Sequence, residues 1–315
     1  QKILVLGEAI VDEYVYCDGL GKSSKDPILA FQSRGRESYI GGSLAVVNHL
    51  SGFCDQVTVL SILGDDENRE KFIRNALVAN VTAKFVYRTD APTITKRRYI
   101  DSHTKAKLFE IYDMRNEIIS PEVENQILES LDKFVRNFDL VLVTDYGHGF
   151  FTPAVISKVT NDANFLVVNA QHNAGNRGFN TIARYPRANY ICFNGQELAI
   201  ETRKRHAPTA DQLLEIAKTI KCPSFTVTLG EYGSLHYDTE AGFNSAPAFA
   251  ARVVDRVGAG DAVMAISGPL VACGAPWEII GLISNVVGAE MVSTLGNRNC
   301  LSKTSIANQI KSLMQ

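Results

Sequence analysis

Residues 139–145 read DLVLVTD, a short run of valine, leucine and threonine between two aspartates. Five similar runs are KILVLG at 2–7, VTVLSIL at 57–63, FLVVNA at 165–170, NYICF at 189–193 and FTVTLG at 225–230. Runs of this length and composition are typical of strands that are buried on both faces. We therefore expect them to form the central sheet of the protein.

Helical patterns separate most of these runs. They lie at 43–52, 67–79, 121–136, 210–219 and 261–273. This alternation favours a parallel sheet covered by helices. The sequence therefore predicts an α/β fold with a doubly wound, mainly parallel sheet flanked by helices. A chain of 315 residues, of which 45% are hydrophobic, can bury the core of one such domain over its whole length.

Two stretches interrupt this rhythm, at about 13–38 and 84–113. The second contains KFVYRT, TITKRRYID and AKLFEIYD, which we interpret as antiparallel strands joined by polar turns. We expect both stretches to form a small β-sheet lid inserted into the core. The exposed face of a lid sheet can also pair with a second subunit, so we expect a homodimer.

Composition argues against several classes of partner. The 32 Lys and Arg and the 34 Asp and Glu are scattered, so the sequence predicts no nucleic-acid or membrane partner. No apolar run approaches the roughly 20 residues that span a bilayer, and no signal peptide opens the chain, so we expect a cytoplasmic protein. The six cysteines form no CxxC pair. Because the chain starts with Gln1, we expect it to be part of a longer protein.

The strongest functional signal is DRVGAGD at 255–261, followed by the apolar helical stretch AVMAISGPLVACG. Gly258 and Gly260 have no side chains, so backbone N–H groups and the positive end of the next helix can face a phosphate. Asp261, in the first turn of that helix, can then accept a proton from an attacking hydroxyl. The alternative interpretation is an ordinary glycine turn with an aspartate at the helix start.

Two further motifs follow predicted strands. NGQE at 194–197 comes after NYICF, where its amide and carboxylate can hold hydrated Mg²⁺ beside phosphates or simply cap a helix. TLGEYG at 228–233 comes at another strand end, where small residues can let the backbone approach a nucleotide or form an ordinary β-turn.

These three motifs resemble, in order and spacing, the NxxE, TxGxxG and DTxGAGD motifs of the ribokinase-like (pfkB) carbohydrate kinases, and the likeness covers nearly the whole chain. GEAIVD at 7–12 is similar to the family's first strand and its substrate-binding aspartate. SSKDPILAF at 23–31, PTITKRRYID at 92–101 and DYGHGFFT at 145–152 resemble the kinase half of bifunctional heptose 7-phosphate kinase and ADP-heptose synthase proteins.

The resemblance implies a reaction and a set of site residues. The reaction is phosphoryl transfer from ATP, with Mg²⁺, to a hydroxyl of a sugar or sugar phosphate of the heptose 7-phosphate type. Its catalytic residues would be Asp261 as the base and Gly258, Ala259 and Gly260 as the anion hole. Its substrate-binding residues would be Asp12, Gly41, Gly42, Asn48, Lys96, Arg98, His148 and Asn169. Its nucleotide-binding residues would be Asn194, Thr228, Gly230, Gly233 and Asn285, with Glu197 holding Mg²⁺ through water and Asp255 holding a monovalent cation such as K⁺.

Several positions on the substrate side depart from the heptose kinases. Ala45 stands where those proteins have a substrate-binding Asn, and Asn48 follows one turn later. His148 replaces a Lys and is either a pocket residue or a packed polar side chain. Residues 169–180 are rich in amides, which can ring a polyol or form an ordinary loop. Arg256 replaces the usual Thr and has no assigned role.

The two lid cations also have two interpretations. Alternate residues of a strand share a face, so Lys96 and Arg98 point the same way. They can meet a substrate phosphate or simply blunt a strand edge.

Other functions stay open. The changed substrate positions favour a regulatory homologue with weak catalysis, against which the intact GAGD argues. Only the alternation of strands and helices suggests a nicotinamide-dependent oxidoreductase. GEAIVDEY at 7–14 stands where that class has GxGxxG, which argues against it. The acceptor can also be a nucleoside or another small polyol. The resemblance implies a cytidylyltransferase, fused or separate, as a partner.

Overall fold

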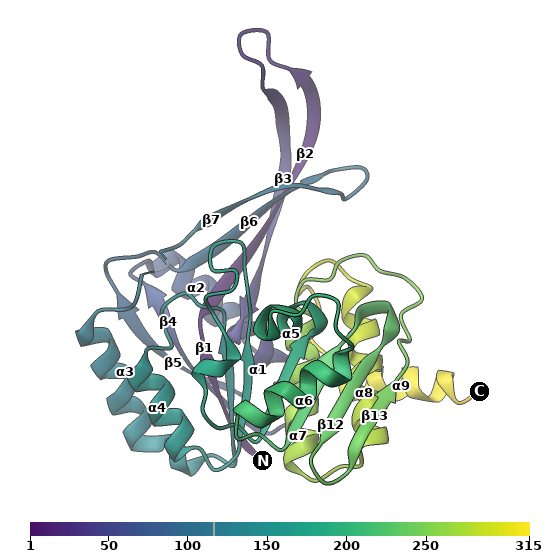
Figure 1. Ribbon diagram of the computed structural model, residues 1–315. Coiled ribbons are helices and arrows are strands. Elements are labelled where there is room, and N and C mark those ends of the chain that lie inside the picture. The colour runs from purple at the N-terminus through teal and green to yellow at the C-terminus, as the bar shows by residue number, and fades with distance from the viewer. Residues whose placement is uncertain (116) are drawn as a thin grey trace.

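The computed structural model describes residues 1–115 and 117–315, and over them a nine-stranded sheet in the order β13-β12-β11-β10-β9-β8-β1-β4-β5 forms the centre of the protein (Figure 1). Its strands are β1 (Lys2–Gly7), β4 (Gln56–Gly64), β5 (Val81–Arg88), β8 (Leu140–Asp145), β9 (Leu166–Ala170), β10 (Tyr190–Asn194), β11 (Ser224–Thr228), β12 (Ser234–Asp238) and β13 (Gly242–Ala246). All neighbouring pairs from β11 to β5 are parallel, whereas β12 and β13 pair antiparallel at one edge. The predicted mainly parallel sheet is confirmed.

The chain builds this sheet outward from β1 in two directions. β4 and β5 extend one side, and β8 to β11 then extend the other. The strand order therefore reverses between β1 and β8. Open α/β sheets bind ligands outside the carboxyl ends of their strands at such a switch point. Gly7 and Asp145, the last residues of these two strands, mark the position where a ligand is expected.

Helices cover both faces of the sheet. One face packs against α3 (Pro121–Phe134), α4 (Pro153–Asp162), α5 (Gly195–Thr202) and α6 (Thr209–Thr219). The other packs against α1 (Ser43–Ser51), α2 (Glu67–Ala76), α7 (Ala259–Ala272), α8 (Trp277–Val292) and α9 (Lys303–Leu313). In the described part of the chain, every helix is too short or too polar to cross a membrane.

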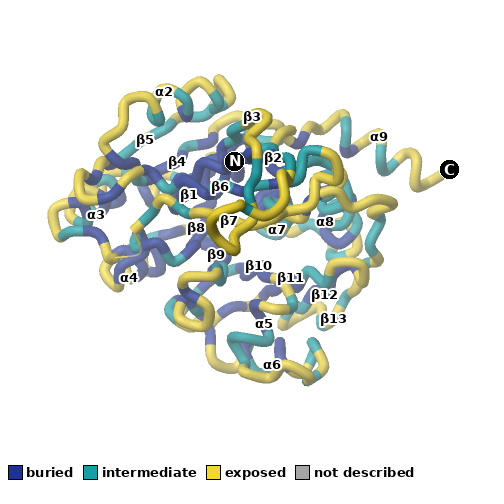
Figure 2. Tube along the Cα trace, turned by 90° about the horizontal axis from the view of Figure 1, so that it is seen from above, coloured by how far each residue is buried: buried dark blue, intermediate teal, exposed yellow. Residues whose placement is uncertain are grey.

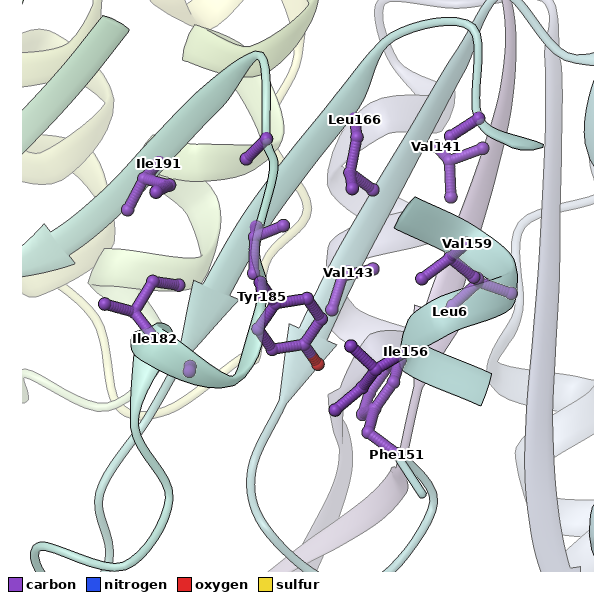
Figure 3. Close-up of a cluster of buried hydrophobic side chains, with 14 of the residues drawn as sticks. Leu6, Val141, Val143, Phe151, Ile156, Val159, Leu166, Ile182, Tyr185 and Ile191 are labelled. Carbon is purple, nitrogen blue, oxygen red and sulfur yellow. The ribbon is translucent and has the colours of Figure 1, made fainter. Parts of the chain in front are cut away.

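The alternation of side chains along β1 shows why the strand runs are apolar throughout. Leu4 and Leu6 point into the cluster beneath α3 to α6, whereas Ile3 and Val5 point into the cluster beneath the other helices. All four are fully buried. Figure 3 shows part of the first cluster, in which Tyr185 lies among aliphatic side chains from the sheet and α4. Both faces of each central strand therefore stabilise the fold.

A second sheet, in the order β3-β2-β6-β7, lies over the carboxyl ends of the central strands (Figures 1 and 2). Its strands are β2 (Ala9–Lys22), β3 (Leu29–Gly42), β6 (Ile94–Asp101) and β7 (Lys107–Asp113). β2 pairs antiparallel with β3, β6 pairs antiparallel with β7, and β2 and β6 pair in parallel. The predicted small second sheet is present, with one parallel pairing where only antiparallel strands were expected.

The prediction that KFVYRT at 84–89 belongs to the lid is wrong. Residues 81–88 form β5, the edge strand of the main sheet, and pair in parallel with β4. Phe85 packs against the cluster of α1, α2 and α7, whereas Val86 belongs to the cluster on the opposite face. A strand that is covered on both faces fits the main sheet, and its exposed polar residues reflect only its edge position.

Candidate active site

A cavity of about 390 Å³ lies between the carboxyl ends of the central strands and the second sheet. The main sheet contributes Asn169 of β9, Asn194 of β10 and Thr228 of β11. The second sheet contributes side chains from β2, β6 and β7, and the start of α7 forms another wall. A cavity of this size and position is suited to a small ligand.

The start of α7 is shaped by glycines. Gly258 precedes the helix with φ 80°, in the left-handed region, and a Cβ there would overlap Oδ1 of Asn297. Both facts restrict the position to glycine. A Cβ at Gly260 would meet nothing within 4 Å, because Gly260 faces the cavity. The Ala259 N–H makes a long bond of 3.4 Å to the carbonyl of Arg256. The backbone at the positive end of α7 is therefore open to the cavity at Gly260.

Asp261 lies in the first turn of α7 and lines the cavity, although only 7% of its surface is exposed. Burial raises the pKa of its carboxyl to about 7, and contacts with Tyr146 and the Gln171 amide oppose this rise. Gln171 Nε2 donates a hydrogen bond of 2.5 Å to Asp261 Oδ1. A carboxylate with a pKa near neutrality, fixed by a neutral amide, is suited to accept a proton.

Lys96 and Arg98 both line the cavity from β6, as the strand alternation predicts. Arg98 Nη1 lies 2.5 Å from Asp12 Oδ1, and its Nε lies 3.1 Å from Glu110 Oε1. Two carboxylates therefore compensate its charge.

The Lys96 ammonium has different neighbours. It lies 5.5 Å and 5.9 Å from the ring centroids of Tyr112 and Tyr146, and no carboxylate of the described residues comes within 4 Å of it. Only 8% of the residue is exposed, and burial lowers the pKa of its amine. The carboxylates of Asp12, Glu8 and Asp261 also attract this ammonium, but none forms an ion pair with it, so the ammonium is suited to receive an anionic group.

Asn169 lines the same cavity and has a buried acceptor. Its Nδ2 donates to the carbonyl of Cys192 at 2.7 Å, whereas its buried Oδ1 accepts no hydrogen bond from the described residues. An acceptor without a donor is costly when buried, so a ligand hydroxyl there would be stabilising.

Asn194 and Glu197 form the capping box of α5, so the helix-cap interpretation of NGQE is confirmed. The Asn194 oxygen accepts from the amides of Gln196 and Glu197, both at 2.9 Å, and Glu197 Oε2 accepts from the Asn194 amide at 2.8 Å. Both residues also line the cavity. Burial raises the pKa of Glu197 to about 8. A buried carboxyl of high pKa at the cavity wall fits a hydrated Mg²⁺ carried by a nucleotide, since Mg²⁺ keeps several waters.

Asp255 does not fit the predicted monovalent cation. The Lys107 ammonium of β7 lies 2.7 Å from Asp255 Oδ1, so a cation of the protein itself already occupies this carboxylate. Burial raises the pKa of Asp255, but Lys107 and Tyr14 lower it more, and the net pKa lies below its ordinary value. The expectation of K⁺ at Asp255 is therefore corrected.

Asn48 does not reach the cavity either. Its Nδ2 donates to the carbonyl of Ala76 at 2.9 Å, and its Oδ1 accepts from the amide of Val78 at 3.1 Å. These bonds fasten α1 to the end of α2. The predicted contact of Asn48 with a substrate is therefore corrected, because both ends of its amide are already bonded.

Of the predicted nucleotide-binding residues, some have structural roles and one is open to a ligand. Asn285 donates to Ser234 Oγ at 2.7 Å and to the carbonyl of Gly281 at 2.9 Å, which is a structural use of its amide. A Cβ at Gly233 would overlap the carbonyl of Ala246, whereas one at Gly230 would meet nothing within 4 Å. Of the two predicted glycines, only Gly230 is open to a ligand.

His148 is buried behind the cavity. Its backbone amide donates to Glu8 Oε1 at 3.0 Å. Burial, with a smaller contribution from Lys96, lowers the pKa of its ring to about 3, so His148 is neutral near pH 7. Gly41 lies beside Asp12, and a Cβ there would overlap Asp12 Oδ2. Gly42 lines the cavity with φ 58°.

Sequence reasoning missed several residues. Glu8, which follows β1 directly, accepts the amides of Tyr146 at 3.1 Å and His148 at 3.0 Å, so it fixes the turn after β8. Gln171 lies in the amide-rich segment but was not selected as a site residue, although it orients Asp261. A polar residue directly after a buried parallel strand is the signal that could have found both.

Comparison with known proteins agrees with this geometry. The profile of the pfkB family carbohydrate kinases matches residues 1–304. The bifunctional protein HldE of Campylobacter jejuni is 28% identical over 270 residues, which are 84% of this chain and 55% of that protein. The HldE protein of Bradyrhizobium diazoefficiens is 25% identical over 302 residues, which are 94% of this chain and 60% of that protein. The chain therefore spans little more than half the length of these relatives.

Solved structures show the same fold. Escherichia coli phosphofructokinase-2 in complex with substrates and products has a TM-score of 0.80 at 14% identity, and the match covers 100% of both chains. Arabidopsis thaliana ribokinase complexed with ribose and ATP has a TM-score of 0.73 at 18% identity, covering 98% of both chains. The ribokinase-like fold is thus confirmed, and the chain belongs to the pfkB family of carbohydrate kinases.

Proposed function

We propose that this chain transfers the γ-phosphoryl group of ATP to a hydroxyl of a sugar phosphate of the heptose 7-phosphate type. The observation that carries the proposal is the position of Asp261. Its buried carboxyl stands at the positive end of α7, beside the open backbone of Gly260, in the cavity where the two sheets meet. A base and an anion site are thus adjacent, as in-line phosphoryl transfer requires.

The reaction proceeds in one displacement. The acceptor hydroxyl donates its proton to Asp261, its oxygen forms a bond to the γ-phosphorus, and the bond from that phosphorus to the bridging oxygen breaks to release ADP. Gln171 holds Oδ1 of Asp261, and the acceptor hydroxyl would approach the same carboxylate from the cavity. Amides at the start of α7 stabilise the charge on the transferred group. A Mg²⁺ ion near Glu197 would neutralise charge on the leaving phosphates.

Lys96 supports a phosphorylated acceptor. Its ammonium is buried in the cavity without a carboxylate partner, and neutral His148 adds no second charge behind it. A phosphate or another anion of the acceptor would supply the missing partner. Asn169 Oδ1 supports the polyol part, since it is a buried acceptor without a donor among the described residues.

A second candidate is a kinase of the same fold that acts on an unphosphorylated polyol or a nucleoside. Arg98, the other cation of the cavity, is already compensated by Asp12 and Glu110, so one ammonium is left for a phosphate. In this alternative, Lys96 would assist the transferring phosphoryl group rather than the acceptor.

An ATP-consumption screen distinguishes these candidates. The panel contains heptose 7-phosphate, other sugar phosphates, free sugars and nucleosides, with Asp261→Asn as the blank. Asp55→Asn is the matched control, because Asp55 is an exposed residue before β4, at the opposite end of the sheet. Turnover of sugar phosphates that Lys96→Met reduces more than turnover of free sugars supports the first candidate. No turnover with any acceptor would leave a regulatory homologue as the function.

We also propose that the second sheet forms a homodimer. The hairpin of β2 and β3 extends away from the body of the protein (Figure 1). This hairpin and β7 expose large apolar side chains, namely Leu20, Ile28, Leu29, Leu108, Phe109 and Ile111. Pairing with a second copy would bury them. Light scattering tests this proposal: a dimer that Phe109→Asp converts to a monomer supports it, whereas a monomeric wild-type protein contradicts it.

The relatives suggest one further partner. They are bifunctional proteins, of which this chain spans little more than half. We propose that a cytidylyltransferase, fused or separate, uses the phosphorylated product. Consumption of that product together with a nucleoside triphosphate, CTP or ATP, by a cell extract would support this, and its accumulation would argue against it.

A further inference from the structure

The carboxylate of Asp255 is saturated with hydrogen bonds. Oδ1 accepts from Lys107 Nζ at 2.7 Å and from the Val257 amide at 3.2 Å. Oδ2 accepts from the Tyr14 hydroxyl at 2.8 Å and from the Gly296 amide at 3.2 Å. A carboxylate offers about four acceptor sites, so none is left for another cation unless a present donor leaves.

These four donors come from different parts of the fold. Tyr14 and Lys107 belong to strands β2 and β7 of the second sheet, whereas Val257 directly precedes Gly258 of the anion hole. Gly296 precedes Asn297, whose side chain packs against Gly258 and lines the cavity. Asp255 is therefore the point where the second sheet is fastened to the loop that faces the phosphate.

Lys107 and Asp255 differ in their surroundings. The side chain of Asp255 is 2% exposed, whereas that of Lys107 is 37% exposed. An ion pair with such an exposed partner contributes little stability as an isolated surface contact. The buried carboxylate, however, needs a positive charge, because a buried anion without a partner is costly. The ammonium, a compact point charge with three donors, meets this need in the way that a small cation would.

We propose that Lys107 is a positioning residue whose ammonium replaces a free monovalent cation at Asp255 and couples the second sheet to the anion hole. The inference rests on the proposed phosphotransfer for its kinetic consequence. β7 also carries Glu110 and Tyr112, which line the cavity. An acceptor that orders β7 would therefore also fix Lys107, and with it the amides that receive the phosphoryl group. The enzyme would need no added K⁺.

The test compares turnover in KCl and in tetramethylammonium chloride at equal ionic strength. Wild-type turnover should be equal in the two salts. Lys107→Met should lose about 10- to 100-fold in tetramethylammonium, because small displacements of catalytic groups cost up to about 10²-fold. KCl should restore a large part of the loss, since K⁺ can enter the site vacated by the ammonium. Lys107→Arg should need no K⁺. Lys105→Met is the matched control on the same hairpin, since Lys105 Nζ bonds to the carbonyl of Ser102 instead.

Hydrogen exchange of the amides of residues 257–260 measures the same coupling without any acceptor. Exchange should be faster in Lys107→Met than in wild type, and KCl should slow it again. This readout separates a wrong acceptor from a wrong assignment of Lys107. Stimulation of the wild type by K⁺, unchanged exchange in Lys107→Met, or a loss of turnover that K⁺ leaves unaltered would overturn the proposal.

Discussion

The two ends of the segment Asp255–Asp261 carry buried aspartates with opposite electrostatics. At the first, four donors, one of them an ammonium, keep the pKa of Asp255 below its ordinary value. At the second, burial raises the pKa of Asp261 to about 7, because its contacts are neutral and Lys96 acts only through space. Burial is common to both. The number and charge of the donors therefore decide that one aspartate holds a loop and the other exchanges a proton.

The largest effect is expected when the proton-accepting end is removed. Asp261→Asn should lower kcat by about 10² to 10⁴-fold, because the amide cannot accept the hydroxyl proton. Nucleotide affinity, measured by calorimetry, should change little, since the backbone of the anion hole stays in place. Asp255→Asn should retain more activity than Asp261→Asn. Equal losses of kcat in the two variants would contradict the assignment of proton transfer to Asp261 and of a structural role to Asp255.

The pH profile separates the two carboxyls in the wild type. Asp261 must be ionised to accept a proton, so kcat/KM should fall about tenfold per pH unit below pH 7 and about 100-fold by pH 5. Asp255 stays ionised over this range, because its pKa is lowered. Steady-state rates between pH 5 and 9 give the profile, and the residual rate of Asp261→Asn serves as the control. An inflection near pH 4 would contradict a raised pKa.

Stability should decrease when the structural end is changed. Asp255→Asn should lower the free energy of unfolding at pH 7 by about 2 kcal/mol, less than is typical of a fully buried pair because Lys107 is partly exposed. A carboxyl with a lowered folded-state pKa contributes stability above its unfolded pKa and loses it as pH falls through the folded value. Urea unfolding should thus show the full difference at pH 7 and a decrease in it once the pH falls below the ordinary pKa of an aspartate, near 4.

The effect of pH on the free energy of unfolding should be opposite for Asp261. Folded Asp261 holds its proton up to about pH 7, whereas the unfolded chain releases it near pH 4, so ionised Asp261 costs stability as pH rises between these values. Asp261→Asn should therefore raise the free energy of unfolding by up to about 4 kcal/mol at pH 8, three pKa units at about 1.4 kcal/mol each, and by nothing at pH 4. A variant that is less stable than the wild type at pH 8 would show that the carboxylate has a partner not described by this geometry.

Much of the fold follows from local patterns. Apolar runs such as 139–145 predict the central strands because both faces of these strands are buried, and that requirement acts on every residue. The edge strand β5 was wrongly predicted to belong to the lid. One of its edges meets solvent, so its exposed polar residues resemble those of a lid strand. The parallel pairing of β2 and β6 could not be predicted, because it is set by the core around the two strands and not by the sequence of either one.

The site, like the fold, has features that local sequence predicts and features that only the folded chain determines. The glycines and the aspartate of 255–261 could be predicted because a turn, a helix start and a base lie within seven consecutive residues. The partners of these residues could not. Lys107 and Asp255 are 148 positions apart, and Gln171 and Asp261 are 90 apart, so only the folded chain brings them together. Asn48 was misassigned for a related reason: its two partners, at 76 and 78, lie on the next helix and its loop.

Glu197 extends the comparison to a third buried carboxyl. Like Asp261 it has no cation beside it, and burial raises its pKa to about 8. A nucleotide bound with Mg²⁺ would bring positive charge to this wall of the cavity and make its surroundings resemble those of Asp255. At pH 7.5 binding should then release on the order of half a proton, because a group near its pKa gives up its proton when a cation approaches. Calorimetry in two buffers of different ionisation enthalpy measures this number, and Glu197→Gln should abolish it. Equal release from the Gln variant would assign the proton to another group and leave Glu197 a cap of α5.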